Sequence, residues 1–263
     1  CGSRFNIKKV DYPIDGINDN DYAANFEIFL KENKADQPFF FWAGVIEPHL
    51  PNGNENYKRL EKEYGISLDQ IKLFPGTEDT PINRQSRANY IYEICYADQQ
   101  LGRMLESLEK ANTLENTLIV VTSDNGTPVT RDKLVGKASP YDLGVHVPLA
   151  IMWPAKVKSG RKVSDFINFA DFAPTFLNAA GIQIPESMSG KSIMPQLLSE
   201  KSGRIDDSRS FVATGLEWHG EFDPVSSTFR TIRDDNYAYI VRYDNVDVKG
   251  EILSGDKAIQ PAR

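Results

Sequence analysis

The residues best suited to chemistry follow an apolar segment that ends at Ser123. Asp124 and Asn125 come first, Gly126 follows, and Lys137 lies in the next loop. Adjacent carboxylate and amide oxygens suit a hard divalent cation such as Ca²⁺, with Mg²⁺ as second choice. Because Ca²⁺ takes roughly 6–8 oxygen ligands, this pair would form only part of a site. Asp-Asn-Gly is also a strong turn sequence whose side chains bond the local backbone, so the pattern alone leaves both readings open.

The chain has three histidines, and each lies next to a predicted strand. His49 stands in Pro-His-Leu-Pro, where two prolines stiffen the backbone around it. His146 directly precedes a strand, which is typical of a structural residue, whereas His219 lies within reach of a site rim. Lys137, in Gly-Lys-Ala-Ser-Pro, is by pattern alone more typical of a solvated loop. No Gly-x-Ser-x-Gly nucleophile elbow is present in the sequence.

Apolar residues at spacings of three, four and seven predict the helices that would support these residues. The expected helices cover residues 21–33, 57–64, 82–112 and 171–181. In the last of them, Asp171 is expected as the N-cap and Gly181 as the C-terminal stop.

Continuous apolar runs predict buried strands between these helices. The run from Phe39 to Val45 is typical of a strand covered on both faces, and it ends just before His49. Residues 116–123 and 146–154 predict two more strands, the first of which leads into Asp124. The alternation of strand and helix favours an α/β fold, with a mostly parallel sheet and helices on both faces. Ligands of such sheets gather at the carboxyl ends of strands.

The pattern changes after about residue 200. Short alternating segments at 210–216, 226–233 and 236–244 predict a small antiparallel α+β subdomain built on hairpins. We therefore expect residues 1–200 to form an α/β region and residues 201–263 to be the C-terminal subdomain.

Composition narrows the possible classes of function. The chain has 263 residues, 40% of them hydrophobic, which is enough for a sizeable core. Its 30 basic and 37 acidic residues are interspersed and give a net charge of −7, which speaks against nucleic-acid binding. No apolar run is long enough to predict a membrane span, and no signal-peptide pattern is present. Two cysteines exclude a disulfide framework.

Four segments, in this order, resemble the sulfatase family of the alkaline-phosphatase superfamily. They are "PFFFWAGVIEPHLP" (38–51), "YADQQLGRMLESLEKANTLENTLIVVTSDNG" (96–126), "GKASPYDLGVHVPLAI" (136–151) and "FADFAPTFLNAAGIQIPESMSGKSIMPQL" (169–197). Any one of them is a weak signal, but the series runs from residue 38 to residue 197, a span of over half of the chain. The resemblance implies an alkaline-phosphatase-like fold.

The resemblance also implies roles for single residues. Asp124 and Asn125 match the Asp-Asn that binds calcium in sulfatases. His49 and Lys137 match the histidine and lysine that contact the sulfate, and we take them as the catalytic residues of this chain. The family's nucleophile is a formylglycine made from the cysteine of a C-x-[PA]-S-R signature.

The N-terminus departs from the family pattern. The signature belongs far upstream of Pro-His-x-Pro, yet only 48 residues precede His49. Cys1 opens "CGSR", which is one residue short of the signature and has Gly before Ser. We expect the formylglycine in an N-terminal half outside this chain, which would act as its partner, and we expect the fragment alone to be inactive.

Within the family, residues 76–102 and the loop before Lys137 are most similar to the heparan N-sulfatase (N-sulfoglucosamine sulfohydrolase) type. This similarity implies a sulfated carbohydrate substrate, namely glycosaminoglycan fragments with N-sulfoglucosamine of heparan sulfate as the narrower choice. Glu47, Arg131 and His219 are weaker candidates for sugar contacts. Family habit implies an extracytoplasmic location, whether periplasmic, secreted or lysosomal.

Two other functions stay open on the sequence. A phosphodiesterase or phosphomutase of the same superfamily would use a Ser or Thr nucleophile and two transition metals. Asn125 and the small number of histidines speak against it. A catalytically inactive sulfatase-like lobe that binds glycans is the third reading.

Overall fold

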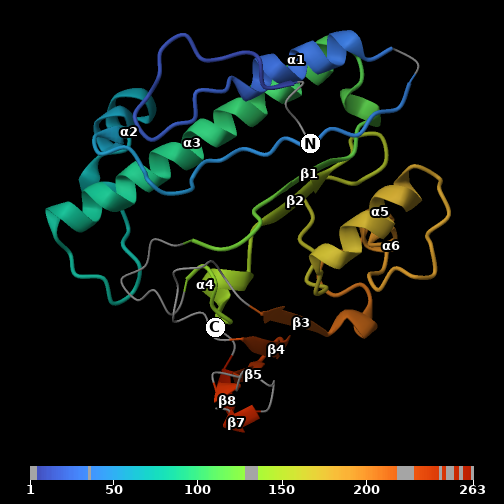
Figure 1. Cartoon of the computed structure of the whole chain (residues 1–263). Coiled ribbons are helices and arrows are strands. Elements are labelled where there is room, and N and C mark those ends of the chain that lie inside the picture. Colours follow the sequence, from blue (N-terminus) through green and yellow to red (C-terminus); the bar gives the residue numbers. More distant parts are fainter. Residues whose placement is uncertain are drawn as a thin grey trace. The chain divides into compact units, whose positions relative to one another are not determined.

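The computed structural model describes most of the chain. The described residues are 5–34, 37–127, 136–217 and 228–242, together with the backbone of 245–246, 252–254 and 257–261. They form two compact units: those of the first run to Glu115, and those of the second begin at Asn116. Figure 1 labels α1 to α6 and most of the strands.

Three helices build the first unit. They are α1 (Tyr22–Glu32), α2 (Asn56–Tyr64) and α3 (Pro81–Lys110), which confirms the three helices predicted in this region. Both shorter helices pack against α3 (Figure 1). The core between α2 and α3 contains the buried residues Leu60, Ile71, Ala88 and Tyr92. None of the helices in the described part of the chain has the length and apolar character that crossing a membrane requires.

The predicted strand from Phe39 to Val45 is wrong in the described structure, because these residues form no ladder. The segment is nevertheless two-sided. Phe41 packs on the rings of Phe26 and Phe29 of α1, with ring centroids 4.8 Å apart in both cases. Trp42, on the other side, is 79% exposed. The apolar run correctly indicated that the segment has apolar side chains on two faces. A strand also needs a neighbouring strand, and none of the described segments pairs with this one.

The second unit begins with a two-stranded sheet. Strand β1 (Ile119–Thr122) pairs with β2 (Leu149–Met152) in antiparallel register, with Ile119 opposite Met152. The expected parallel order is therefore not confirmed, since none of the named strands in the described residues forms a parallel pair. A parallel return needs a long crossover connection, usually a helix. Only the single turn of α4 (Asp142–Val145) is described between β1 and β2.

Two helices follow, α5 (Phe172–Ala179) and α6 (Met194–Leu198), and the first confirms the predicted helix at 171–181. Gly181 has φ +71°, as expected for a helix stop. Asp171, however, does not cap α5 with its side chain. Its carboxylate instead forms a buried ion pair with Arg209 at 2.7 Å and accepts a hydrogen bond from Lys191 N at 2.8 Å. Asp171 is thus the N-cap residue of α5, as predicted, but its side chain makes no capping bond because the distant arginine and the Lys191 amide engage its carboxylate.

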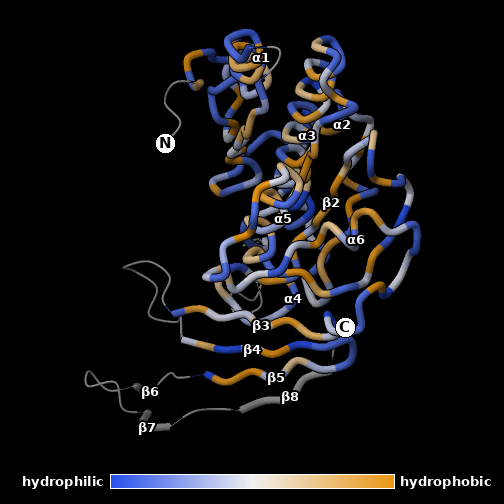
Figure 2. The backbone as a smooth tube through the Cα atoms, turned by 90° about the vertical axis from the view of Figure 1, so that its right-hand side faces the viewer, coloured by the Kyte–Doolittle hydropathy of each residue, from blue (hydrophilic) through white to orange (hydrophobic). Residues whose placement is uncertain are grey.

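A four-stranded antiparallel sheet ends the second unit, which confirms the predicted hairpins (Figure 2). Its order is β3 (Phe211–Leu216), β4 (Phe229–Asp234), β5 (Tyr237–Arg242) and β8 (Lys257–Pro261). A separate pair is formed by β6 (Asn245–Val246) and β7 (Ile252–Ser254). The β4–β5 turn is fixed by Asp234, whose Oδ1 accepts from Asn236 N at 2.8 Å and Tyr237 N at 2.7 Å. Short 3₁₀ turns occur at Leu68–Gln70, Leu114–Asn116, Phe169–Asp171 and Asp207–Arg209.

Candidate functional site

The loop after β1 carries the two predicted metal ligands. Asp124 is exposed and Asn125 is half-buried. Ser123 Oγ donates to the Asn125 carbonyl at 2.7 Å, so the hydroxyl shapes the loop. Within the described part of the chain, no hydrogen bond or ion pair engages the Asp124 carboxylate or the Asn125 side-chain amide. The alternative of a turn locked by these side chains therefore has no support in the geometry.

Gly126 fixes the loop against α4. Its N–H donates to the Gly144 carbonyl at 2.8 Å. A Cβ at Gly126 would lie 1.7 Å from the Leu143 carbonyl oxygen, far inside van der Waals contact. Only glycine permits this approach of two backbones, so the loop carrying Asp124 and Asn125 is held directly on the α4 turn.

The turn that carries Lys137 is attached to the same loop. Lys137 N donates to the Thr127 carbonyl at 3.0 Å, and Ser139 N donates to the Gly136 carbonyl at 3.1 Å. The next residue, Ala138, has φ +65°, a left-handed conformation that costs a non-glycine residue roughly 1–2 kcal/mol. Strain of this kind is found where the surroundings impose a conformation, often at functional sites. The structure thus brings the predicted lysine together with the predicted metal ligands through the backbone.

An ion pair that the sequence analysis did not identify supports α4. Arg233 of β4 places Nη1 2.5 Å from Oδ1 of Asp142, the first residue of α4. The side chains are only 15% and 31% exposed, respectively. Alternation along β4 indicated which residues face inward, but no local pattern indicates a partner 91 positions away.

Asp124 and Asn125 fit a calcium ion by their donor chemistry, because both offer hard oxygen atoms without another partner among the described residues. They fit as part of a set. The described residues contain no group of three His, Cys, Asp or Glu side chains that could hold a metal. The remaining ligands of a complete site would have to come from elsewhere.

His49 belongs to the first unit and is exposed. Its Nδ1 lies 2.7 Å from the Leu50 carbonyl oxygen. A carbonyl oxygen can only accept, so Nδ1 is the donor in this contact. The flanking prolines noted in the sequence both follow cis peptide bonds, at Glu47-Pro48 and Leu50-Pro51.

Two buried glutamates anchor the loop on either side of His49. Glu47 accepts from Asn18 N at 2.7 Å and from the Tyr22 hydroxyl at 2.9 Å. Its oxygens are therefore used inside the first unit, which favours a structural role over the sugar contact expected from the sequence.

Glu93 of α3 anchors the other side of the His49 loop. It accepts from Asn52 Nδ2 at 2.8 Å and Gly53 N at 3.3 Å. The side chain is completely buried. The pKa of Glu93 is raised to about 7, chiefly by desolvation and to a smaller extent by the nearby Glu47 and Asp15. The hydrogen bonds from Asn52 and Gly53 act in the opposite direction.

The other sequence candidates are quickly placed. Arg131, His219 and Cys1 lie outside the described residues. His146 ends α4 and is exposed, and its N–H donates to the Asp142 carbonyl at 2.9 Å.

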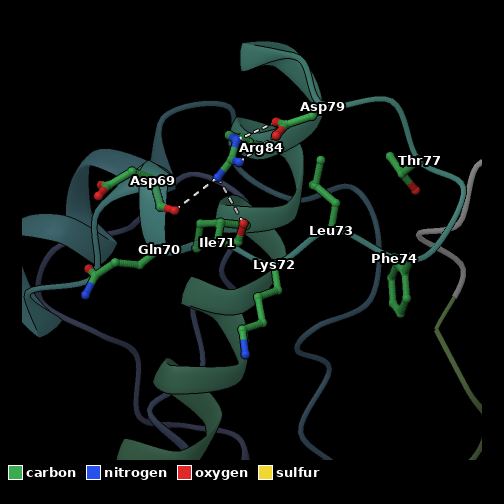
Figure 3. A pocket seen from close by; sticks show the side chains of 9 residues that line it. All are labelled: Asp69, Gln70, Ile71, Lys72, Leu73, Phe74, Thr77, Asp79 and Arg84. Carbon is green, nitrogen blue, oxygen red and sulfur yellow. Dashed lines mark hydrogen bonds and ion pairs between the residues drawn. The ribbon is translucent and has the colours of Figure 1, made fainter.

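An open hollow in the first unit is organised by Arg84 rather than by a ligand (Figure 3). Its Nε and Nη2 contact Asp79 at 2.6 and 2.7 Å, which lowers the pKa of that carboxyl. Nη1 donates to the carbonyls of Leu68, Asp69 and Ile71. These contacts use the whole guanidinium to hold the segment before α3, so this hollow is structural.

Two models of known protein families match the chain. The sulfatase family model matches residues 3–182, and the model for the C-terminal region of N-sulphoglucosamine sulphohydrolase matches residues 133–256. The sulfatase YdeN of Escherichia coli strain K12 is 30% identical over 220 residues, which cover 81% of this chain and 35% of that protein.

Two solved structures share the fold. A Bacteroides fragilis protein described as a sulfatase superposes with a TM-score of 0.69 at 24% identity, covering 90% of this chain and 50% of that one. A second structure, solved in complex with its substrate D-glucosamine-2-N,6-O-disulfate, superposes with a TM-score of 0.56 at 23% identity, covering 78% and 39%.

The chain therefore spans about a third of the length of YdeN and half or less of these two structures. The sulfatase match covers residues 3–182, well over half of the chain, and includes the Pro-His-Leu-Pro, Asp-Asn-Gly and Gly-Lys-Ala-Ser-Pro segments. On this match, the chain belongs to the sulfatase family.

Proposed function

We propose that this chain provides the calcium and sulfate ligands of a sulfatase that acts on sulfated glycosaminoglycan fragments. The observation that carries the proposal is the backbone connection between the loop of Asp124 and Asn125 and the turn of Lys137. This connection holds two oxygen ligands and one ammonium group in a single packed structure, next to the strained Ala138.

The roles of the chain's residues follow from their chemistry. Asp124 and Asn125 would hold calcium, which when bound supplies Lewis-acid catalysis at the sulfate group. Lys137 would place its charge on the sulfate oxygens, where preorganised cations stabilise developing negative charge. His49 would contact the sulfate or protonate the leaving oxygen or nitrogen through Nε2.

The narrower substrate is N-sulfoglucosamine of heparan sulfate. Two observations support it: the match of residues 133–256 to the C-terminal family of N-sulphoglucosamine sulphohydrolase, and a structural neighbour whose bound substrate is a glucosamine disulfate. Arg131 and His219 remain candidate sugar contacts on sequence grounds alone.

The complete enzyme would include an N-terminal half that carries the formylglycine. Residues 1–200 would then complete the catalytic domain, and residues 201–263 would form the C-terminal subdomain. The chain alone would be inactive, and the enzyme would act outside the cytoplasm, as sulfatases commonly do.

A peptide map and intact mass of the natural polypeptide test this proposal. An upstream C-x-[PA]-S-R peptide with cysteine converted to formylglycine is the expected result. A native start at Cys1 would exclude the sulfatase mechanism and favour an inactive glycan-binding lobe.

Calcium binding is tested separately by calorimetry on the complete protein. Asp124→Ala should abolish it, whereas the exposed Asp98→Ala on α3 should not. Full calcium affinity in the Asp124 variant would remove this residue from the site.

A further inference from the structure

We propose that Arg233 is a positioning residue that holds the loops of Asp124 and Lys137 in place through Asp142. The inference rests on the proposed function, because that function makes the two loops a binding site, but the exchange experiment below needs no bound ligand. Arg233 itself touches neither predicted ligand, and its effect would pass through α4.

The contact at Asp142 is well placed to control α4. This helix is a single turn of four residues, too short to be stable without tertiary contacts. Asp142 is its first residue, and its carboxylate lies 2.5 Å from the guanidinium of Arg233, which belongs to β4. A carboxylate at a helix N-terminus is also favoured by the local dipole, so Arg233 binds a group that already stabilises the turn.

The α4 turn in turn contacts both functional loops through backbone atoms. The Gly144 carbonyl accepts from Gly126 N at 2.8 Å, which holds the metal-side loop. A Cβ on Gly144 would lie 2.4 Å from the Gly136 carbonyl oxygen and 2.7 Å from that of Ser139, which shows how closely the Lys137 turn packs on it. A shift of α4 would therefore move both loops, because the closest of these approaches are between backbone atoms.

The same strand offers a matched control. Arg230 of β4 also forms an ion pair, with Glu217, but its side chain is 49% exposed and that of Glu217 is 72% exposed. Among the described residues, no hydrogen bond or ion pair joins either side chain to α4. Removal of either arginine deletes one positive charge from β4, but only Arg233→Ala releases Asp142.

Hydrogen–deuterium exchange tests positioning without any ligand. The amides of Gly126 and Lys137 donate to Gly144 and Thr127 carbonyls, so they should exchange faster in Arg233→Ala and at the wild-type rate in Arg230→Ala. Arg233→Lys should restore part of the protection. Unchanged exchange in Arg233→Ala, or an equal change in the Arg230 variant, would overturn the proposal.

Binding by the complete protein provides the second readout, with calcium alone and inorganic sulfate as probes. Loss of a group bonded directly to a metal ligand commonly weakens metal binding roughly 10- to 100-fold, and we expect about the lower end of that range for Arg233→Ala because it acts one step further out. The reversed pair, Arg233→Asp with Asp142→Arg, should recover affinity that each single change loses. Wild-type affinity in Arg233→Ala would refute the positioning role, whereas no binding by the wild type would refute the proposed function and leave the exchange result to decide this inference.

Discussion

Replacement of Glu93 by glutamine should increase the free energy of unfolding, relative to the wild type, by more at pH 8 than at pH 4. Glu93 is completely buried under the loop that carries His49, where it accepts hydrogen bonds from Asn52 and Gly53. Its pKa is raised from 4.5 to about 7, chiefly by desolvation. This difference corresponds to about 3 kcal/mol in favour of the protonated form, which glutamine resembles in shape and charge.

The sign follows from proton linkage. Below pH 4.5 both the folded and the unfolded states hold the proton, so the stabilisation is fully present. As the pH rises towards 7, the unfolded state releases the proton first, and the folded wild type loses about 3 kcal/mol of stability that the glutamine variant keeps. Above pH 7 the difference no longer changes.

Urea unfolding of both proteins at pH 4 and pH 8 measures this difference. Glu106→Gln is the matched control on the same helix, because that side chain is 64% exposed and its pair with Lys110 contributes little. An equal stability difference between Glu93→Gln and wild type at both pH values would refute the conclusion that desolvation governs this carboxyl.

Three further changes test packing. Gly126→Ala should destabilise the second unit by roughly 1–3 kcal/mol and impair calcium binding, because its Cβ would lie 1.7 Å from the Leu143 carbonyl oxygen. The control is Gly102→Ala on α3, which has open space around it and should stabilise the protein by about 1 kcal/mol. Arg209→Met leaves the buried Asp171 carboxylate unpaired and should cost roughly 3–5 kcal/mol by denaturant unfolding. Leu60→Ala, at a fully buried position between α2 and α3, should cost about 2–5 kcal/mol by the same assay.

Opposite results have clear meanings for these changes. Equal stability of Gly126→Ala and Gly102→Ala would mean that the loop does not press on α4. If Arg209→Met unfolds at the same denaturant concentration as the wild type, the buried ion pair does not stabilise the fold. If Leu60→Ala does so, the α2–α3 core is loosely packed.

Local patterns predicted the helices well because each carries its own signals. The start of α1 is an example: Asp21 caps it by accepting from Ala24 N at 2.9 Å, next to the apolar stripe that the sequence shows. The hairpin of β4 and β5 was equally visible, since alternation and the Asp-rich turn both lie within a few residues.

The failures all involve partners that are distant in sequence. The run from Phe39 to Val45 looked like a buried strand because periodicity reports apolar faces but not the presence of a neighbouring strand. Asp171 lies at the N-cap position as predicted, but nothing near it in the sequence indicated that its carboxylate pairs with Arg209. Likewise, nothing near Asp142 indicated Arg233. For the site, residue types placed Asp124, Asn125 and Lys137 among the candidates, but only the backbone contacts of Gly126 and Gly144 explain how they are held together.

Sulfate release by the complete protein tests the central claim most directly. The substrates are disaccharides sulfated at the N-, 2-O- or 6-O-position, assayed with calcium and again with a chelator. We predict release from the N-sulfated sugar by the wild type, and loss of that release both with the chelator and in Asp124→Ala. Equal release from the O-sulfated sugars would contradict the narrower substrate, and full activity of Asp124→Ala or no release from any sugar would contradict the proposed sulfatase site itself.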